Sequence, residues 1–272
     1  MKKFSSALWL IVRWIVLIIV LIAVYLPLIM IIAYSFSTAR DVGGEFGTPT
    51  FALYAQLFNN EKLLSATYNT LIIGLVSAFL ATVLGTTASV GIHYMRQKVK
   101  PIVEASSQIT VVNAEIVTAM GFFLLMLIIR EVVTIPEGFS LIWLIIAHTV
   151  ITMPYVMLTV SPRLKQLNPN LLEASMDLGA GPMRSLFTVM LPQLFVAMIS
   201  GFALAFTLSL DDFVITKINA GSEIETISTY VYSGIRHTLK EDIRALSTII
   251  FVLVLAILIV TNVIKNKKEK QR

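Results

Sequence analysis

Residues 14–39 read WIVLIIVLIAVYLPLIMIIAYSFSTA, with no charged side chain between Arg13 and Arg40. A helix that crosses the hydrocarbon core of a bilayer needs about 20 consecutive apolar residues, so this run is long enough to span it. A cleaved signal peptide has an apolar region of only about 7 to 15 residues, which is too short to account for this one. We therefore expect a retained transmembrane helix at about residues 12–35.

The rest of the 272-residue chain has the same apolar character. It is 57% hydrophobic and only 14% charged, whereas a soluble domain carries roughly 25% charged residues. No segment is long and polar enough to form a separate soluble domain, so we expect one transmembrane domain over residues 1–272. The chain has no cysteine and only three scattered histidines, which argues against a disulfide or a metal site. We also expect no nucleic-acid partner.

Uncharged runs predict an all-α membrane protein with six transmembrane helices, at roughly 12–35, 68–93, 107–129, 140–160, 191–212 and 245–264. With both termini in the cytoplasm, 14 of the 21 basic residues lie inside and 7 outside, a bias that the positive-inside rule favours. The outer loops are then net acidic, which favours a cationic solute over an anionic one. Topology alone explains the same asymmetry more simply.

The predicted cytoplasmic loop 163–190 carries the sharpest local signals. Asn168 and Pro169 favour a helix start, and Gly179 favours its end. Pro182 can then begin the next helix after Gly181. The short helix in between would carry a stripe of small and apolar residues and two carboxylates. Helices that lie on lipid headgroups prefer Lys and Arg on their polar face, so we favour docking on a protein partner. The stripe consists of Leu171, Ala174, Ser175 and Leu178, and the carboxylates are Glu173 and Asp177.

This loop resembles the EAA motif of ABC importer permeases, whose pattern is Glu-Ala-Ala, three residues, Gly, and later a hydrophobic-Pro pair. The matching residues are Glu173, Ala174, Ser175 (where a second Ala is usual), Asp177, Leu178 and Gly179, then Leu191 and Pro192. The resemblance implies a type I ABC importer permease fold, in which the loop forms a cytoplasmic coupling helix that inserts into a groove of an ATPase.

The same resemblance implies a non-catalytic permease subunit with no cofactor of its own, because ATP and Mg are bound by a partner ABC ATPase dimer. It further implies a second homologous permease subunit, an extracellular or periplasmic solute-binding protein, and a place in the bacterial plasma (inner) membrane, in contact with its lipid.

A narrower similarity concerns the solute. Residues 209–215, SLDDFVI, resemble the Ser-Leu/Met-Asp-Asp stretch of the PotC-type permeases of spermidine/putrescine importers. Residues 113–117, NAEIV, resemble that subfamily's Pro-Asp-Ile-Val stretch, with Glu115 in place of Asp and without the Pro. The resemblance implies a polyamine substrate and places Glu115, Asp211 and Asp212 on its path.

The chemistry of these acids agrees with a cation path. A charge at the centre of a membrane helix costs several kcal/mol, so Glu115 should face an aqueous cavity or an opposing charge. Asp211 and Asp212 end an uncharged run, where an interfacial boundary explains them equally well. Adjacent residues on a helix point about 100° apart, so we expect only one of the two to face the path.

Other polar and aromatic residues in the predicted helices are weaker candidates. We expect His148 to form an interhelical hydrogen bond rather than to bind a ligand. Aromatic faces attract ammonium groups, although aromatic residues in membrane helices more often pack or anchor at the interface. The candidates are Trp143, Tyr155, Phe206 and Tyr230.

Three alternatives stay open. A type I permease for ferric ion, a sugar or a phosphonate is the main one. A cation channel would conduct without nucleotide. An intramembrane enzyme would also place acids in the bilayer, but the chain has no H-E-x-x-H, no P-loop G-x-x-x-x-G-K-[ST] and no convincing nucleophile and base pair.

Overall fold

The computed structural model describes residues 2–39, 42–132, 138–168, 170–220, 224–235, 243–252 and 255. All regular structure in these ranges is helical. The chain forms two compact units, Ser65–Tyr230 and Met1–Leu64 with Val231–Arg272. Each unit is described by itself.

The smaller unit contains α1 (Lys2–Ser35) and α2 (Ala52–Asn59). None of the most apolar 18-residue window of α1 is buried, which suits a helix surrounded by lipid. The Tyr54 hydroxyl of α2 lies 2.8 Å from Ser35 Oγ. The Arg244 guanidinium, in the described helical residues 243–252, donates a 2.8 Å hydrogen bond to the Ala39 carbonyl.

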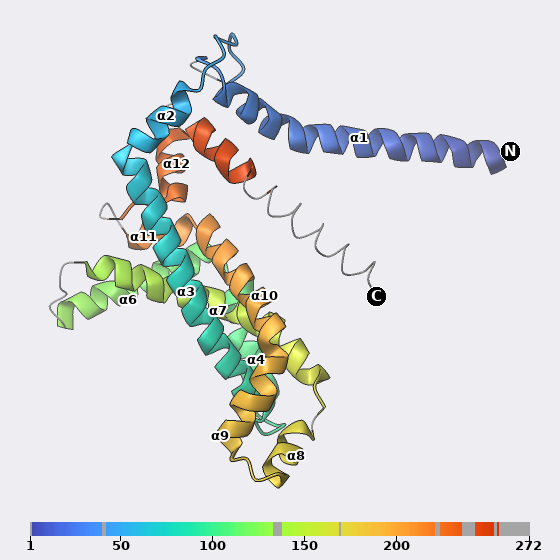
Figure 1. Ribbon diagram of the computed structural model, residues 1–272, viewed down its shortest axis with the longest axis vertical. Coiled ribbons are helices and arrows are strands. Elements are labelled where there is room, and N and C mark those ends of the chain that lie inside the picture. Colours follow the sequence, from blue (N-terminus) through green and yellow to red (C-terminus); the bar gives the residue numbers. More distant parts are fainter. Residues whose placement is uncertain are drawn as a thin grey trace. The chain divides into compact units, whose positions relative to one another are not determined.

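The core of the larger unit lies between α3 (Glu61–His93), α7 (Phe139–Gln166) and α10 (Leu191–Asp211). Figure 1 shows these helices side by side. Gly85 on α3 and Gly201 on α10 let the helices approach closely, because a Cβ atom at either position would lie 3.0 Å from an atom of the Val156 side chain on α7. Small residues at helix contacts are the usual means of tight packing in membranes.

Buried hydroxyl groups along α3 find acceptors within the helix. Thr70, Ser77 and Thr82 each donate a hydrogen bond of 2.6–2.7 Å to the carbonyl four residues earlier. Lipid offers no hydrogen bonds, so internal bonds of this kind let a membrane helix carry polar side chains in its core.

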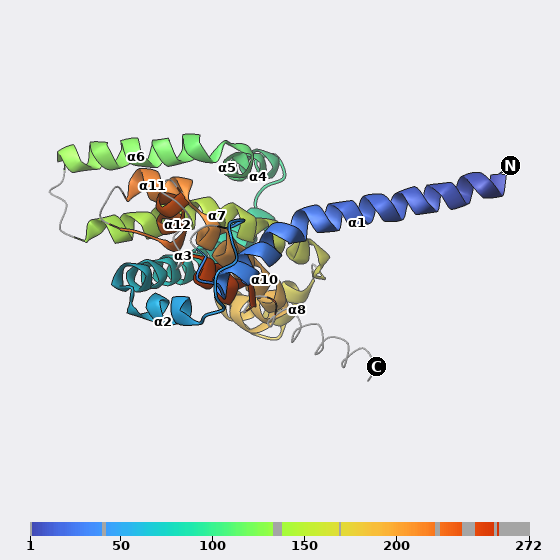
Figure 2. The same ribbon diagram turned by 90° about the horizontal axis from the view of Figure 1, so that it is seen from above.

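The predicted helix 107–129 is instead two helical pieces. The first piece is α4 (Lys100–Ser107) with α5 (Ile109–Val112), and the second is α6 (Glu115–Val132), bent by 100° from it. The break lies at Asn113, whose backbone is extended and whose amide N–H closes α5 on the Ile109 carbonyl at 2.9 Å. Figure 2 shows α6 on one side of the larger unit, beside α11 (Val214–Asn219).

The cytoplasmic loop predicted at 163–190 contains α8 (Leu171–Asp177), α9 (Pro182–Ser185) and a π-helical turn, η1 (Leu186–Met190). The predicted turn signals are confirmed at two positions. Gly179 follows α8 in the left-handed region with φ +87°, and Pro182 begins α9 directly after Gly181. Asn168 Oδ1 accepts the Asn170 amide N–H at 3.0 Å. Pro169 lies outside the described residues.

Four helices in the described part of the chain are long and apolar enough to cross a membrane, and the bent pair adds a fifth if it counts as one span. The four segments are Val12–Ser35, Glu61–His93, Phe139–Gln166 and Pro182–Asp211. Most of the predicted sixth helix, 245–264, lies outside the described residues, although Ile243–Val252 is a shorter apolar helix. A further helix, α12 (Ile227–Ile235), follows α11.

Candidate functional site

A cavity of about 320 Å³ opens in the larger unit between α5, α6, α7, the end of α10 and the start of α11. All three predicted path acids, Glu115, Asp211 and Asp212, lie in its wall. The structure therefore brings together residues that are almost 100 positions apart in the sequence. The wall also contains Thr110, Asn113, Thr118, His148, Thr152, Tyr155 and Ser209.

Glu115 occupies the first position of α6, directly after the break. Its side chain lines the cavity together with those of Asp211 and Asp212. Free backbone N–H groups at a helix N-terminus favour a negative charge, so the break itself helps to hold this carboxyl. The Asn113 side-chain amide donates a 3.1 Å hydrogen bond to Thr118 Oγ1 across the break.

Asp212 is buried and has a structural task. Its Oδ1 accepts the Ile215 amide N–H at 3.1 Å, and its Oδ2 accepts the amide N–H and hydroxyl of Thr216 at 2.9 and 2.8 Å. These bonds fix the first turn of α11. Asp211 is exposed at the end of α10. Both neighbours thus reach the cavity wall, one exposed and the other buried.

His148 of α7 connects these acids to the helix core. Its Nδ1 lies 2.7 Å from Ser209 Oγ on α10, and its Nε2 lies 3.2 Å from Thr216 Oγ1 on α11. Ser209 Oγ in turn lies 3.2 Å from Ser77 Oγ on α3. The prediction of an interhelical hydrogen bond at His148 is confirmed, and this polar network holds four helices in register. The sequence alone did not reveal Ser209 and Thr216 as its partners.

Of the four candidate aromatic residues, only Tyr155 is in the cavity wall. Trp143 is buried, and its indole N–H donates a 3.2 Å hydrogen bond to Asn219 Oδ1. Phe206 stacks on Phe202, and Tyr230 is buried. The α7 residues that line the cavity could have been found from their spacing in the sequence. His148, Thr152 and Tyr155 recur every three or four residues and so share one helix face.

The charges in the described cavity wall have one sign. It contains three carboxylates and neither Lys nor Arg. A concave site of one sign raises the local concentration of the opposite charge. Hydroxyl, amide and aromatic groups from the same wall add hydrogen-bond acceptors and a π-face. This arrangement suits an organic cation with several donor groups. Among the described residues, no group of three or more His, Cys, Asp or Glu side chains is arranged to hold a metal ion.

The second predicted site is α8 and the turn after it. Glu173, Ala174, Asp177 and Gly179 are exposed, whereas Ser175 is partly buried with its Oγ 2.9 Å from Ser185 Oγ. Exposed apolar side chains accompany the acids, and Leu178 is 89% exposed. Exposed apolar side chains that gather on one surface are a mark of protein interaction sites. The other exposed apolar residues here are Met183 and Phe187.

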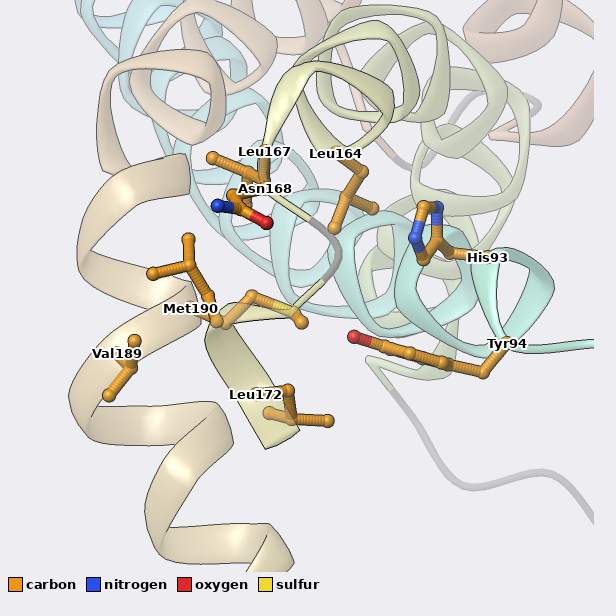
Figure 3. Close-up of a pocket in the computed structure, with 9 residues that line it drawn as sticks. His93, Tyr94, Leu164, Leu167, Asn168, Leu172, Val189 and Met190 are labelled. Atoms are coloured by element: carbon orange, nitrogen blue, oxygen red, sulfur yellow. The ribbon is translucent and has the colours of Figure 1, made fainter. Parts of the chain in front are cut away.

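Beneath α8 lies a small cavity of about 20 Å³, between the ends of α3 and α7 and the turn η1. Figure 3 shows Tyr94 at the end of α3 and Leu172 of α8 at its edge. Leu172 packs against the core of the larger unit. Burial, and then the negative charge of Glu173, raise the pKa of Tyr94. The side of α8 that carries Leu172 is thus held against the core of the larger unit.

Comparison with known proteins finds relatives among transport permeases. No family model matches the chain. It is 32% identical over 247 residues to the spermidine/putrescine transport system permease protein PotC of Escherichia coli (strain K12), covering 90% of each chain. It is also 32% identical over 251 residues to the putrescine transport system permease protein PotI of that strain, covering 91% of this chain and 88% of the other.

A solved structure has the same fold. A bacterial ABC transporter involved in the import of the acidic polysaccharide alginate matches with a TM-score of 0.70, at 15% identity and over 96% of this chain and 97% of that one. At this identity the match concerns the fold alone.

Proposed function

Because this chain belongs to the family of PotC and PotI polyamine transport permeases, we propose that it is the transmembrane permease subunit of an ATP-driven ABC importer for polyamines. Its helices form part of the translocation path, and it is a multi-pass protein of the bacterial inner membrane. The observation that carries the substrate class is the cavity wall, which contains Glu115, Asp211 and Asp212 and, among its described residues, neither Lys nor Arg.

Spermidine and putrescine are flexible chains with an ammonium group at each end. Asp211 and Glu115 offer exposed carboxylates to such a group, and the Tyr155 ring lies in the same wall. Asp212 is buried in the cavity wall, so its negative charge attracts the ammonium group without exposing the carboxylate. Its hydrogen bonds also keep α11 in place. An anionic solute would meet repulsion from all three, which disfavours phosphonate.

Energy has to come from a partner. The exposed acidic and apolar surface of α8 supports docking on an ATPase of the ABC class, with Glu173, Ala174, Ser175, Asp177 and Gly179 as the coupling residues. The chain itself is non-catalytic, and ATP and Mg belong to the ATPase dimer. A second homologous permease and an outer solute-binding protein complete the transporter, and ATP binding drives alternating access of the path.

The decisive experiment is ATP-dependent uptake of radiolabelled spermidine and putrescine by membrane vesicles that contain the co-expressed transporter, with and without this chain. Uptake that requires the chain, ATP and the binding protein supports the proposal. Flux without ATP would indicate a channel. If the ATPases co-purify with the chain but no polyamine is taken up, the substrate assignment is wrong.

A further inference from the structure

A second hollow, of about 140 Å³, lies next to the acidic cavity in the larger unit. The two are lined by adjoining residues of the same two helical pieces. On α7 the wall of the acidic cavity includes Tyr155, and that of the second hollow includes Pro154. Around α5, Thr110 belongs to the cavity and Gln108 to the hollow. The second hollow therefore lies close to the acidic cavity.

The second hollow contains one acid, Glu104 of α4, and this acid is engaged by a lysine. Lys165 Nζ, in the last turn of α7, lies 3.4 Å from Glu104 Oε1. The Lys165 side chain is 56% exposed and that of Glu104 33%. An ion pair this exposed is weak, because water and salt screen it. Breaking the Lys165–Glu104 pair therefore costs little.

The rest of the hollow suits a primary ammonium group. Ser107, Gln108 and Ser161 line it together with the apolar side chains of Met157 and Leu158. Pro162 has no amide N–H, so the Leu158 carbonyl lacks its usual helical donor. Hydroxyl, amide and carbonyl oxygens beside a carboxylate match the three N–H donors of an ammonium head, and the apolar side chains match a methylene chain.

The hollow lies at the α8 end of the unit. Glu104 and Lys165 share a further small cavity with His93, and His93 also lines the cavity beneath α8. Lys100 is a second cation at this place, and its Nζ donates a 3.3 Å hydrogen bond to the His93 carbonyl. The end of α3 thus connects the docking surface with the Glu104–Lys165 pair.

We propose that the hollow between α4 and α7 is a second binding site for the ammonium group of the transported amine. In the absence of amine, Lys165 pairs with Glu104, and the ammonium group of the amine displaces Lys165 when it binds. This proposal rests on the proposed function. With both termini in the cytoplasm, as the positive-inside rule favours, this site faces the cytoplasm. An amine inside the cell then competes with Lys165 for Glu104 and slows further import.

The experiment uses the complete transporter in proteoliposomes, with ATP inside and binding protein and radiolabelled spermidine outside. Unlabelled spermidine at increasing concentration inside the vesicles measures the concentration that halves uptake. Lys165→Gln removes the internal competitor and should lower this concentration about three- to fivefold, because the site is then fully available. Glu104→Gln should raise it at least as much, and Glu104→Asp should keep it near the wild-type value.

Lys98→Gln is the matched control. It removes the same charge from an exposed position near α4 that does not line the hollow, and it should leave the half-inhibitory concentration unchanged. Shifts of Lys165→Gln and Glu104→Gln in the same direction would show that the pair is only structural and overturn the proposal. Unchanged values in both, or no inhibition of the wild type, would overturn it as well. If the wild-type transporter takes up no spermidine at all, it is the proposed function that fails.

Discussion

His148 Nε2 lies 3.4 Å from Asp212 Oδ2, and both side chains are almost completely buried. The imidazole and the carboxylate share Thr216 as a hydrogen-bond partner. An acid on the predicted substrate path is thus also part of the framework that joins α7, α10 and α11. The neighbouring Asp211 is exposed and makes no such contribution, which separates two residues that the sequence presents as equivalent.

The first prediction compares Asp211 and Asp212. Asp212→Asn should lower the apparent melting temperature of the detergent-solubilised transporter, because an amide cannot accept all three bonds and the loss is about 1–3 kcal/mol. Asp211→Asn should leave the melting temperature unchanged and reduce spermidine uptake several-fold. Both variants are compared by fluorescence-detected unfolding and by vesicle uptake. Equal melting temperatures would contradict the role assigned to Asp212.

The second prediction concerns Glu115. Glu115→Gln should reduce polyamine uptake at least tenfold at low substrate while the ATPases still co-purify, because the cavity loses a carboxylate but no helix contact. Glu131→Gln removes an exposed charge from the same helix α6, outside the cavity wall. Normal uptake by Glu115→Gln, or an equal loss in Glu131→Gln, would count against the cation path.

The third prediction concerns the docking surface. Glu173→Ala should abolish uptake, either by releasing the ATPases or by uncoupling them from transport. Leu178→Ser should weaken co-purification of the ATPases without lowering thermal stability, because Leu178 is 89% exposed and holds no part of the core. Glu61→Ala, an exposed acid at the start of α3, serves as the control. Normal transport by Glu173→Ala would refute the docking assignment.

The fourth prediction concerns helix packing. Gly85→Leu should destabilise the protein by about 1–3 kcal/mol or prevent folding, because even a Cβ atom there would lie 3.0 Å from the Met153 carbonyl and Val156. Gly91→Leu, two turns later on α3, meets nothing within 4 Å and should be neutral or slightly stabilising. Similar melting temperatures of the two variants would argue against close contact of α3 and α7.

The long helices could be predicted from the sequence because an uncharged apolar run has few other solutions in a bilayer. The runs predicted at 140–160 and 191–212 correspond to α7 and α10, and α7 extends further because Arg163 and Lys165 can remain helical beyond the apolar run. The turns at Gly179 and Pro182 could be predicted because backbone geometry limits the residues that suit them.

Tertiary relationships could not be predicted in the same way. The break at Asn113 depends on the packing of α5 on α7 and of α6 on α11, and no proline or glycine marks it. Glu115 alone hinted at it, as an acid in an apolar run. The contacts of His148 with Ser209 and Thr216 join residues 61 and 68 positions apart, and a single sequence contains no signal for such a pairing.

The broken helix also sets an order of events during biosynthesis. α1 satisfies its own backbone and has an apolar surface, so it can partition into lipid as soon as it is made. The extended backbone at Asn113 and the carboxyl of Glu115 need protein around them, and lipid alone cannot supply it. Their neighbours α7 and α11 are synthesised later. The segment that carries Glu115 therefore settles into its final place only after most of the chain has entered the membrane.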